Sequence, residues 1–103
     1  MKNWKETAIS LGSLRAKEKR VFSFESESKL DNIKEISPSC NSCTKVLGYD
    51  PNTKELKLEF STGEFPVHLS LEGRNYYDVN KTVVVYYQDN TSGKLYFSAR
   101  IYK

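Results

Sequence analysis

Two cysteines, Cys40 and Cys43, form the sharpest local motif of the sequence, a CxxC spacing. Such a pair can bind zinc, act as a redox couple or close a disulfide. A structural zinc site needs four ligands, and His68 is the single histidine of the chain. A thioredoxin-like redox pair needs the start of a helix in a βαβ unit, whereas the residues around this pair are typical of strands and turns. We therefore favour a structural role for the pair, expect no metal and no cofactor, and keep a small redox or metal protein as an alternative.

Motifs of other catalytic sites do not occur in the sequence. It contains no Gly-x-Ser-x-Gly, no His-Glu-x-x-His and no phosphate-binding loop. His68 lies in the alternating run Phe65–Leu71, on the face opposite its apolar residues, and so is expected to face solvent or a partner. Catalysis by a histidine needs a nucleophile and an orienting acid close by. We predict that the chain is not an enzyme.

Tyrosine is the commonest aromatic residue of the chain, with seven copies. Tyr86, Tyr96 and Tyr102 alternate with apolar residues in two C-terminal runs, which puts them on the face opposite the core. Tyr76 and Tyr77 are expected in a connection nearby. Tyrosine is enriched in protein interfaces, although pairing across strands of a half-exposed sheet explains the pattern equally well. These five tyrosines are our first candidates for partner binding.

Positive charge is concentrated near the N-terminus. The net charge is +3, and residues 1–20 hold six of the sixteen bases but two of the thirteen acids. Residues 1–8 are therefore a candidate basic arm, in which Lys2, Trp4 and Lys5 are further candidates for partner binding. Nucleic-acid binders carry denser basic clusters with interleaved aromatics, so we do not expect direct binding to nucleic acid.

Alternation of apolar and polar residues runs through most of the chain and is typical of half-buried strands. It is clearest at Leu56, Leu58 and Phe60, and the sequence Asp50-Pro51-Asn52 before them has strong turn chemistry. Residues 73–80 and 89–93 are expected to be connections. Strands are expected near residues 9–11, 21–25, 33–36, 44–49, 55–60, 65–71, 82–88 and 95–102.

The length of 103 residues fits one domain with one core. Many short strands with turn signals about every ten residues indicate a sandwich or barrel. We predict a single all-β domain over residues 1–103, an antiparallel β-sandwich of seven to nine short strands.

Four motifs follow one another along the chain: Ile9-Ser10-Leu11-Gly12, Val21-Phe22-Ser23-Phe24, the run from Ser39 to Thr44, and Leu56-Lys57-Leu58-Glu59-Phe60. Their order resembles that of the hydin-type (ASH-like) immunoglobulin-like domains, which implies an immunoglobulin-like antiparallel β-sandwich. The likeness is greatest to small bacterial and phage relatives with a Ser-Cys-Gly-Cys-Thr signature, although Asn41-Ser42 replace the single glycine here. The resemblance implies a sandwich fold and a binding or scaffolding role.

These features give an expectation for function. We expect an accessory protein of a phage virion, a decoration or auxiliary capsid protein, whose partner is a protein of a larger assembly. The alternative is a cytoplasmic adaptor that binds a peptide or protein, and self-association stays open. No secretory signal and no apolar run of membrane-spanning length occurs in the sequence, so we expect a virion or cytoplasmic location and no membrane partner.

Overall fold

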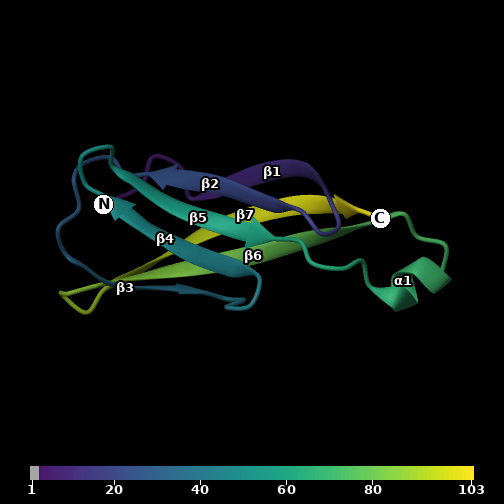
Figure 1. Cartoon of the computed structure of the whole chain (residues 1–103). Helices are drawn as coiled ribbons and strands as arrows, with labels where there is room; N and C mark the ends of the chain where they lie inside the picture. Colours follow the sequence, from purple (N-terminus) through teal and green to yellow (C-terminus); the bar gives the residue numbers. More distant parts are fainter. Residues whose placement is uncertain (1–2) are drawn as a thin grey trace.

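The computed structural model describes residues 3–103, which form two β-sheets and one short helix (Figure 1). The all-β class predicted from the sequence is confirmed, and the described part holds seven strands, within the expected range. In chain order the elements are β1 Ala8–Arg15, β2 Lys19–Glu25, β3 Ile33–Pro38, β4 Thr44–Asp50, β5 Glu55–Ser61, α1 Val67–Leu71, β6 Tyr76–Tyr87 and β7 Ser92–Tyr102.

The strands form a four-stranded sheet in the order β1-β7-β6-β3 and a three-stranded sheet in the order β2-β5-β4. Every pair is antiparallel except β1 with β7, which is parallel. The expectation of a purely antiparallel sandwich is therefore wrong at this pair. The reason lies just before β1, where Trp4 forms an antiparallel bridge with Ser26 beside β2. The chain starts along one sheet and crosses to the other, where it continues beside β7.

The core lies between the two sheets. From the three-stranded sheet, Leu56 and Leu58 are 0% exposed, as the alternation along β5 predicted. From the other sheet, Phe97 contacts Phe22 and Phe60 with ring centroids 4.7 and 5.4 Å apart. Rings from both sheets thus meet in one layer. The complete set of buried apolar residues is Trp4, Leu14, Phe24, Leu56, Leu58, Phe60, Val83, Val85, Tyr87, Leu95, Phe97, Ala99 and Ile101.

The molecule is elongated, with extents of 48 × 23 × 21 Å and a radius of gyration of 15.1 Å. A compact chain of this length has a radius of gyration of about 13 Å. The extra length comes from the long β6–β7 hairpin and from α1, which projects beyond the ends of both sheets (Figure 1). Among residues 3–103, no helix is long and apolar enough to cross a membrane.

The expected strand at residues 65–71 is wrong, because this segment forms α1. It lies past the sheets, where no strand is available for pairing, so its backbone bonds locally: Ser70 N donates to Pro66 O and Glu72 N to His68 O, each at 3.2 Å. The apolar residues that gave the alternating pattern do not enter the core. Val67 is 72% exposed and Leu71 is 83% exposed.

The connection expected at residues 73–80 is also wrong in its second half, because β6 begins at Tyr76. Tyr76 pairs with Tyr102 and Tyr77 with Ile101, a core residue, so the hairpin continues to the end of the core. Its inward residues, Tyr77 and Val79, pack against the core and alternate with the exposed Tyr76, Asp78 and Asn80, which is a strand pattern that the prediction of a connection overlooked. This extension places Tyr76 in a sheet with the other candidate tyrosines.

Candidate functional site

Four exposed tyrosines share the outer face of the four-stranded sheet, which we call the tyrosine face. Tyr76, Tyr86, Tyr96 and Tyr102 are 43%, 41%, 46% and 37% exposed. Their positions follow from strand geometry, since side chains alternate between the two faces and the inner positions of β6 and β7 are filled by core residues. The sequence predicted this for Tyr86, Tyr96 and Tyr102, and their exposed positions agree.

One end of the tyrosine face is held rigid by an aromatic and ionic cluster. Tyr76 and Tyr102 lie opposite each other with ring centroids 5.7 Å apart. Arg100 places its guanidinium carbon 4.3 Å from the centre of the Tyr76 ring. It also donates from Nε and Nη2 to the two carboxylate oxygens of Asp78, at 2.8 and 3.2 Å. These contacts favour one orientation of the Tyr76 ring.

Electrostatics in this cluster favours the charged forms of both ionic groups. The hydrogen bond from Arg100, supported by its charge, lowers the pKa of Asp78 below the ordinary value of 3.8. The hydrogen bond to Asp78 is the main cause that raises the pKa of Arg100. Both side chains are accessible to solvent, so the pair contributes little to stability on its own. Its main effect is to orient Tyr76.

Small polar side chains fill the space between the tyrosines. The outward positions of the central strands and β1 include Ser10, Ser13, Asn80, Thr82, Ser92 and Ser98. Tyrosine with serine and asparagine is the mixture that antibody paratopes use, because it combines large rigid rings with adaptable hydrogen bonding. From Tyr86 to Tyr102 the face runs about 33 Å along the strands and about 15 Å across them. This footprint of about 500 Å² is smaller than the roughly 800 Å² that each partner buries in a standard interface.

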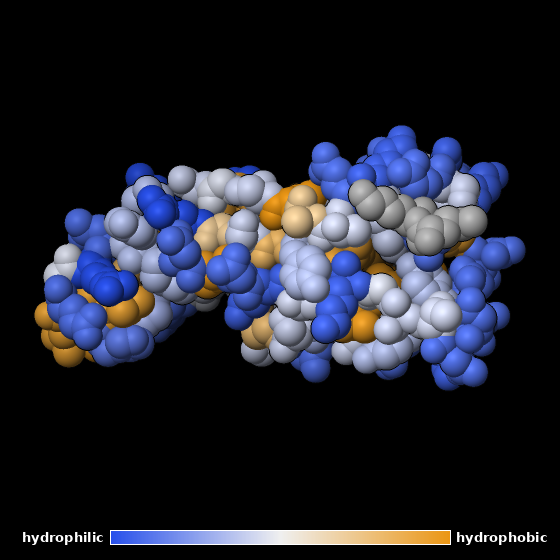
Figure 2. All heavy atoms as spheres, turned by 180° about the vertical axis from the view of Figure 1, so that it is seen from behind, coloured by the Kyte–Doolittle hydropathy of each residue, from blue (hydrophilic) through white to orange (hydrophobic). Residues whose placement is uncertain are grey.

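Figure 2 shows the side of the molecule opposite to that in Figure 1. Pale residues of intermediate hydropathy lie among orange and blue ones over its middle, and hydrophobic residues gather at the projecting end. The exposed Val67 and Leu71 of α1 belong to that end. The outer face of the other sheet differs, because Lys19, Lys57 and Glu59 and their neighbours make it a mixed-charge surface. Only the four-stranded sheet therefore presents a row of exposed aromatic rings among the described residues.

The remaining candidate aromatics lie elsewhere. Tyr77 is half-buried and packs edge-on against Phe65 at 5.4 Å, and burial raises its pKa. Trp4 is 3% exposed and donates from Nε1 to the hydroxyl of Tyr87 at 2.9 Å. The ring of Trp4 is thus part of the core, because its bridge to Ser26 holds it over the end of the sheets. We leave both Trp4 and Tyr77 out of the proposed surface.

Lys2 and Lys5 were proposed for partner binding together with Trp4, and of these two lysines the structure describes only Lys5. Lys5 forms an ion pair with Glu25 at 3.1 Å, and its backbone N donates to the Glu25 carbonyl at 2.9 Å. The described part of the expected basic arm is therefore paired with the end of β2. Lys2 lies outside the described residues.

Arg100 and Asp78 are the residues of this face that the sequence reasoning missed. Both pairs belong to the same register of β6 with β7, in which Asp78 lies opposite Arg100 and Tyr76 lies opposite Tyr102. If residues 76–80 are assigned to a strand, counting residue pairs of the hairpin outward from the Asp89 loop places Asp78 opposite Arg100. The loop itself is clear in the sequence, and Asp89 Oδ1 accepts from Thr91 N at 3.1 Å.

Cys40 and Cys43 form a disulfide in the loop between β3 and β4. His68 is exposed on α1, far along the chain from both. Among residues 3–103, no group of three or more His, Cys, Asp or Glu side chains is placed to hold a metal ion. The pair therefore closes a small loop and does not extend into a larger cluster.

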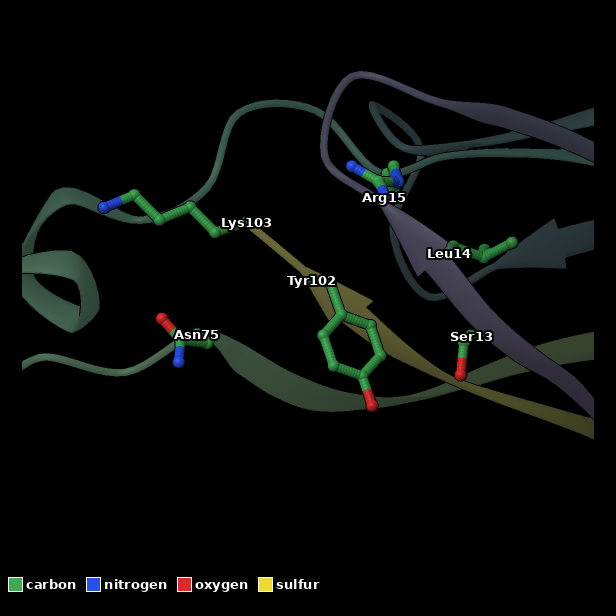
Figure 3. A pocket seen from close by; sticks show the side chains of 6 residues that line it. All are labelled: Ser13, Leu14, Arg15, Asn75, Tyr102 and Lys103. Carbon is green, nitrogen blue, oxygen red and sulfur yellow. The ribbon is translucent and has the colours of Figure 1, made fainter.

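A depression lies at the end of β1, beside Tyr102, with a volume of about 570 Å³ (Figure 3). Arg15 and Lys103 line it together with Asn75, Ser13 and Leu14. The two cations do not converge on it, because Lys103 reaches towards α1 and its Nζ donates to Ser70 Oγ at 2.5 Å (Figure 3). The depression is open and extends the end of the tyrosine face.

Comparisons of this chain with protein-family models, with curated proteins and with solved structures each found no match. The assignment of a function therefore depends on the residues and geometry described above.

Proposed function

We propose that this chain is a non-enzymatic immunoglobulin-like binding domain that attaches to a protein partner through its tyrosine face. The observation that carries the proposal is the row of four tyrosines, each 37–46% exposed, on one face of one sheet. Exposed aromatic rings held in fixed orientations bury a large area at low entropic cost. The cluster of Arg100, Asp78 and Tyr76 supplies that rigidity at one end.

The immunoglobulin-like assignment is supported by strand order. In that fold the second, fifth and fourth strands form one sheet, and the third, sixth and seventh form the other. The sheets β2-β5-β4 and β7-β6-β3 have the same composition. The parallel addition of β1 to β7, after the bridge of Trp4 with Ser26, is a first strand divided between the sheets. Nuclear Overhauser contacts between Ile9 and Phe97 test this order, and contacts of Ile9 with β2 in their place would refute it.

For the biological setting, we propose an accessory role on a phage virion, as a decoration or auxiliary capsid protein. A single small domain with one partner-binding face suits attachment to a repetitive assembly, and the resemblance to hydin-type relatives points to a scaffolding role. The partner is then a protein surface of that assembly, and no catalytic step is involved.

The test is co-sedimentation of the tagged chain with particles purified from an infected-cell lysate. We expect the wild-type chain to travel with the particles and Tyr96→Lys to stay at the top of the gradient. Leu47→Lys is the matched control, because Leu47 is 45% exposed on the opposite sheet against 46% for Tyr96. A wild-type chain absent from particles refutes the virion role. A Tyr96→Lys chain that binds like wild type refutes the tyrosine face.

A further inference from the structure

The edge of β2 differs from the other three sheet edges of the described chain. The outer strands of the two sheets are β1 and β3, and β2 and β4. The pairing of β1 and of β4 is interrupted by a bulge, and β3 has a register shift and ends at Pro38. Such interruptions are common ways of blocking an edge against further strands. In contrast, β2 pairs with β5 in an unbroken register from Lys19 to Glu25.

Two hydrogen bonds at the end of β2 show which of its backbone N–H and C=O groups have no partner strand. Ser26 N donates to Lys54 O at 2.8 Å, on the side of β5. The Glu25 carbonyl accepts from Lys5 N at 2.9 Å, on the opposite side. Since backbone groups alternate along a strand, those of Lys19, Val21 and Ser23 point towards the open edge. The N-terminal segment covers the edge from Glu25 onward, so only these three residues present unpaired backbone groups at this edge.

This open stretch is complementary to itself. Val21 is at its centre and is 55% exposed. Lys19 lies at one end and has no ion-pair partner among the described residues. At the other end, Glu25 and Glu55 lie directly opposite each other in the register, and Glu25 also pairs with Lys5 at 3.1 Å, so these three side chains together carry one net negative charge. An antiparallel copy of the same strand would bring the basic end of each chain to the acidic end of the other.

We propose that a second copy of this chain pairs antiparallel with the edge of β2, with Val21 opposite the same residue of the second copy. In this register Lys19 of one copy lies opposite Ser23 of the other, and its long side chain reaches the diagonal Glu25. Three residue pairs then exchange about six backbone hydrogen bonds. The two three-stranded sheets join into one continuous sheet, and the symmetry is the two-fold type that closes after two copies. The tyrosine face belongs to the other sheet, so the dimer does not depend on the proposed function.

The contact is short and largely polar, which places it in the weak, transient class of interfaces. We expect a dissociation constant on the order of 0.1 mM. Sedimentation equilibrium between about 10 µM and about 1 mM covers this range. The wild-type chain should rise from its monomer mass of 11.9 kDa towards twice that value.

Val21→Pro tests the register directly. The Val21 N–H points away from β5, so proline removes a hydrogen bond of the dimer and none of the monomer, as proline is tolerated at free strand edges. We expect it to remain at 11.9 kDa throughout. Val21→Thr is the matched control, because it keeps the amide and the branched shape and should still dimerise. If Val21→Pro does not fold, Lys19→Glu serves in its place, since it sets an acid against the acidic end and should weaken the dimer.

Amide hydrogen exchange identifies the surface used. In the wild-type chain, the amides of Lys19, Val21 and Ser23 should gain protection as concentration rises, while that of Phe22 is protected throughout by β5. A mass of 11.9 kDa over the whole range overturns the proposal. So does a Val21→Pro chain that dimerises like wild type, or protection of these amides only when a foreign protein is added.

Discussion

Arg100 and Asp78 face each other across the β6–β7 hairpin and form a two-point hydrogen bond, with Nε–Oδ1 at 2.8 Å and Nη2–Oδ2 at 3.2 Å. The same guanidinium lies over the ring of Tyr76. A planar cation that is fixed by a carboxylate on one side can hold an aromatic ring on the other. The ionic pair therefore acts on the tyrosine face chiefly by limiting the motion of Tyr76.

The first prediction concerns the pH dependence of this pair. Arg100 lowers the pKa of Asp78 in the folded chain, so the pair's contribution is complete above the ordinary value of 3.8 and is lost as pH falls through the lower, folded value. The cluster should therefore stay intact through neutral and mildly acidic pH. A carbon-detected NMR titration of the Asp78 carboxyl measures this. In Arg100→Gln its pKa should return to near 3.8. An unchanged titration in the variant would show that Arg100 is not the cause.

A second prediction tests the hydrogen bond that fixes Trp4 in the core. Tyr87→Phe removes the acceptor of the Trp4 indole N–H, and both side chains are 3% exposed. An unpaired buried donor costs about 1–3 kcal/mol, and we expect the free energy of unfolding to fall by that amount in urea denaturation. Tyr86→Phe is the neighbouring control, on the exposed face, and should change stability by less than about 0.5 kcal/mol. Equal losses in the two variants would contradict the assignment.

A third prediction concerns the bulge of β4. Gly48 has φ of +128°, a region that other residues avoid. Gly48→Ala should lower the free energy of unfolding by about 1–3 kcal/mol, because the strained backbone must be kept or the bulge must change. Gly93→Ala is the control, since its added Cβ would meet the Tyr87 hydroxyl at an ordinary 3.6 Å. That variant should be neutral or slightly stabilised. A Gly48→Ala chain as stable as wild type would show that the bulge is not needed.

Much of the fold could be predicted from the sequence where strands border the core. Leu56 and Leu58 alternate with charged residues because one face of β5 is buried and the other is accessible to solvent. The same logic places Tyr96 outward and Phe97 inward. Here the hydrophobic pattern and the structure report the same physical fact, the position of each side chain relative to the core.

The rest could not be predicted because the pattern loses its meaning away from the core. Val67 and Leu71 alternate like a strand but lie beyond both sheets, where a helix is the local way to satisfy the backbone. Tyr76 follows Gly73 and Asn75, which are typical of connections, yet it belongs to a strand because its pairing with Tyr102 comes from the extended hairpin. Trp4 resembled a surface anchor in a basic arm, and its burial depends on a bridge to Ser26 that no local pattern encodes.

The last prediction concerns the disulfide of Cys40 and Cys43. The loop that it closes contains four residues, which corresponds to about 2 kcal/mol of lost unfolded-state entropy in the chain-entropy estimate. We therefore expect the double variant Cys40→Ser, Cys43→Ser to stay folded and to lose at most about 2 kcal/mol of unfolding free energy. Wild-type chain treated with a reductant should match it in urea denaturation. If the double variant failed to fold although all core residues are unchanged, the pair would have a greater role than closing one loop. Equal stability of the oxidised chain and the double variant would instead show that the constraint is already present in the unfolded ensemble.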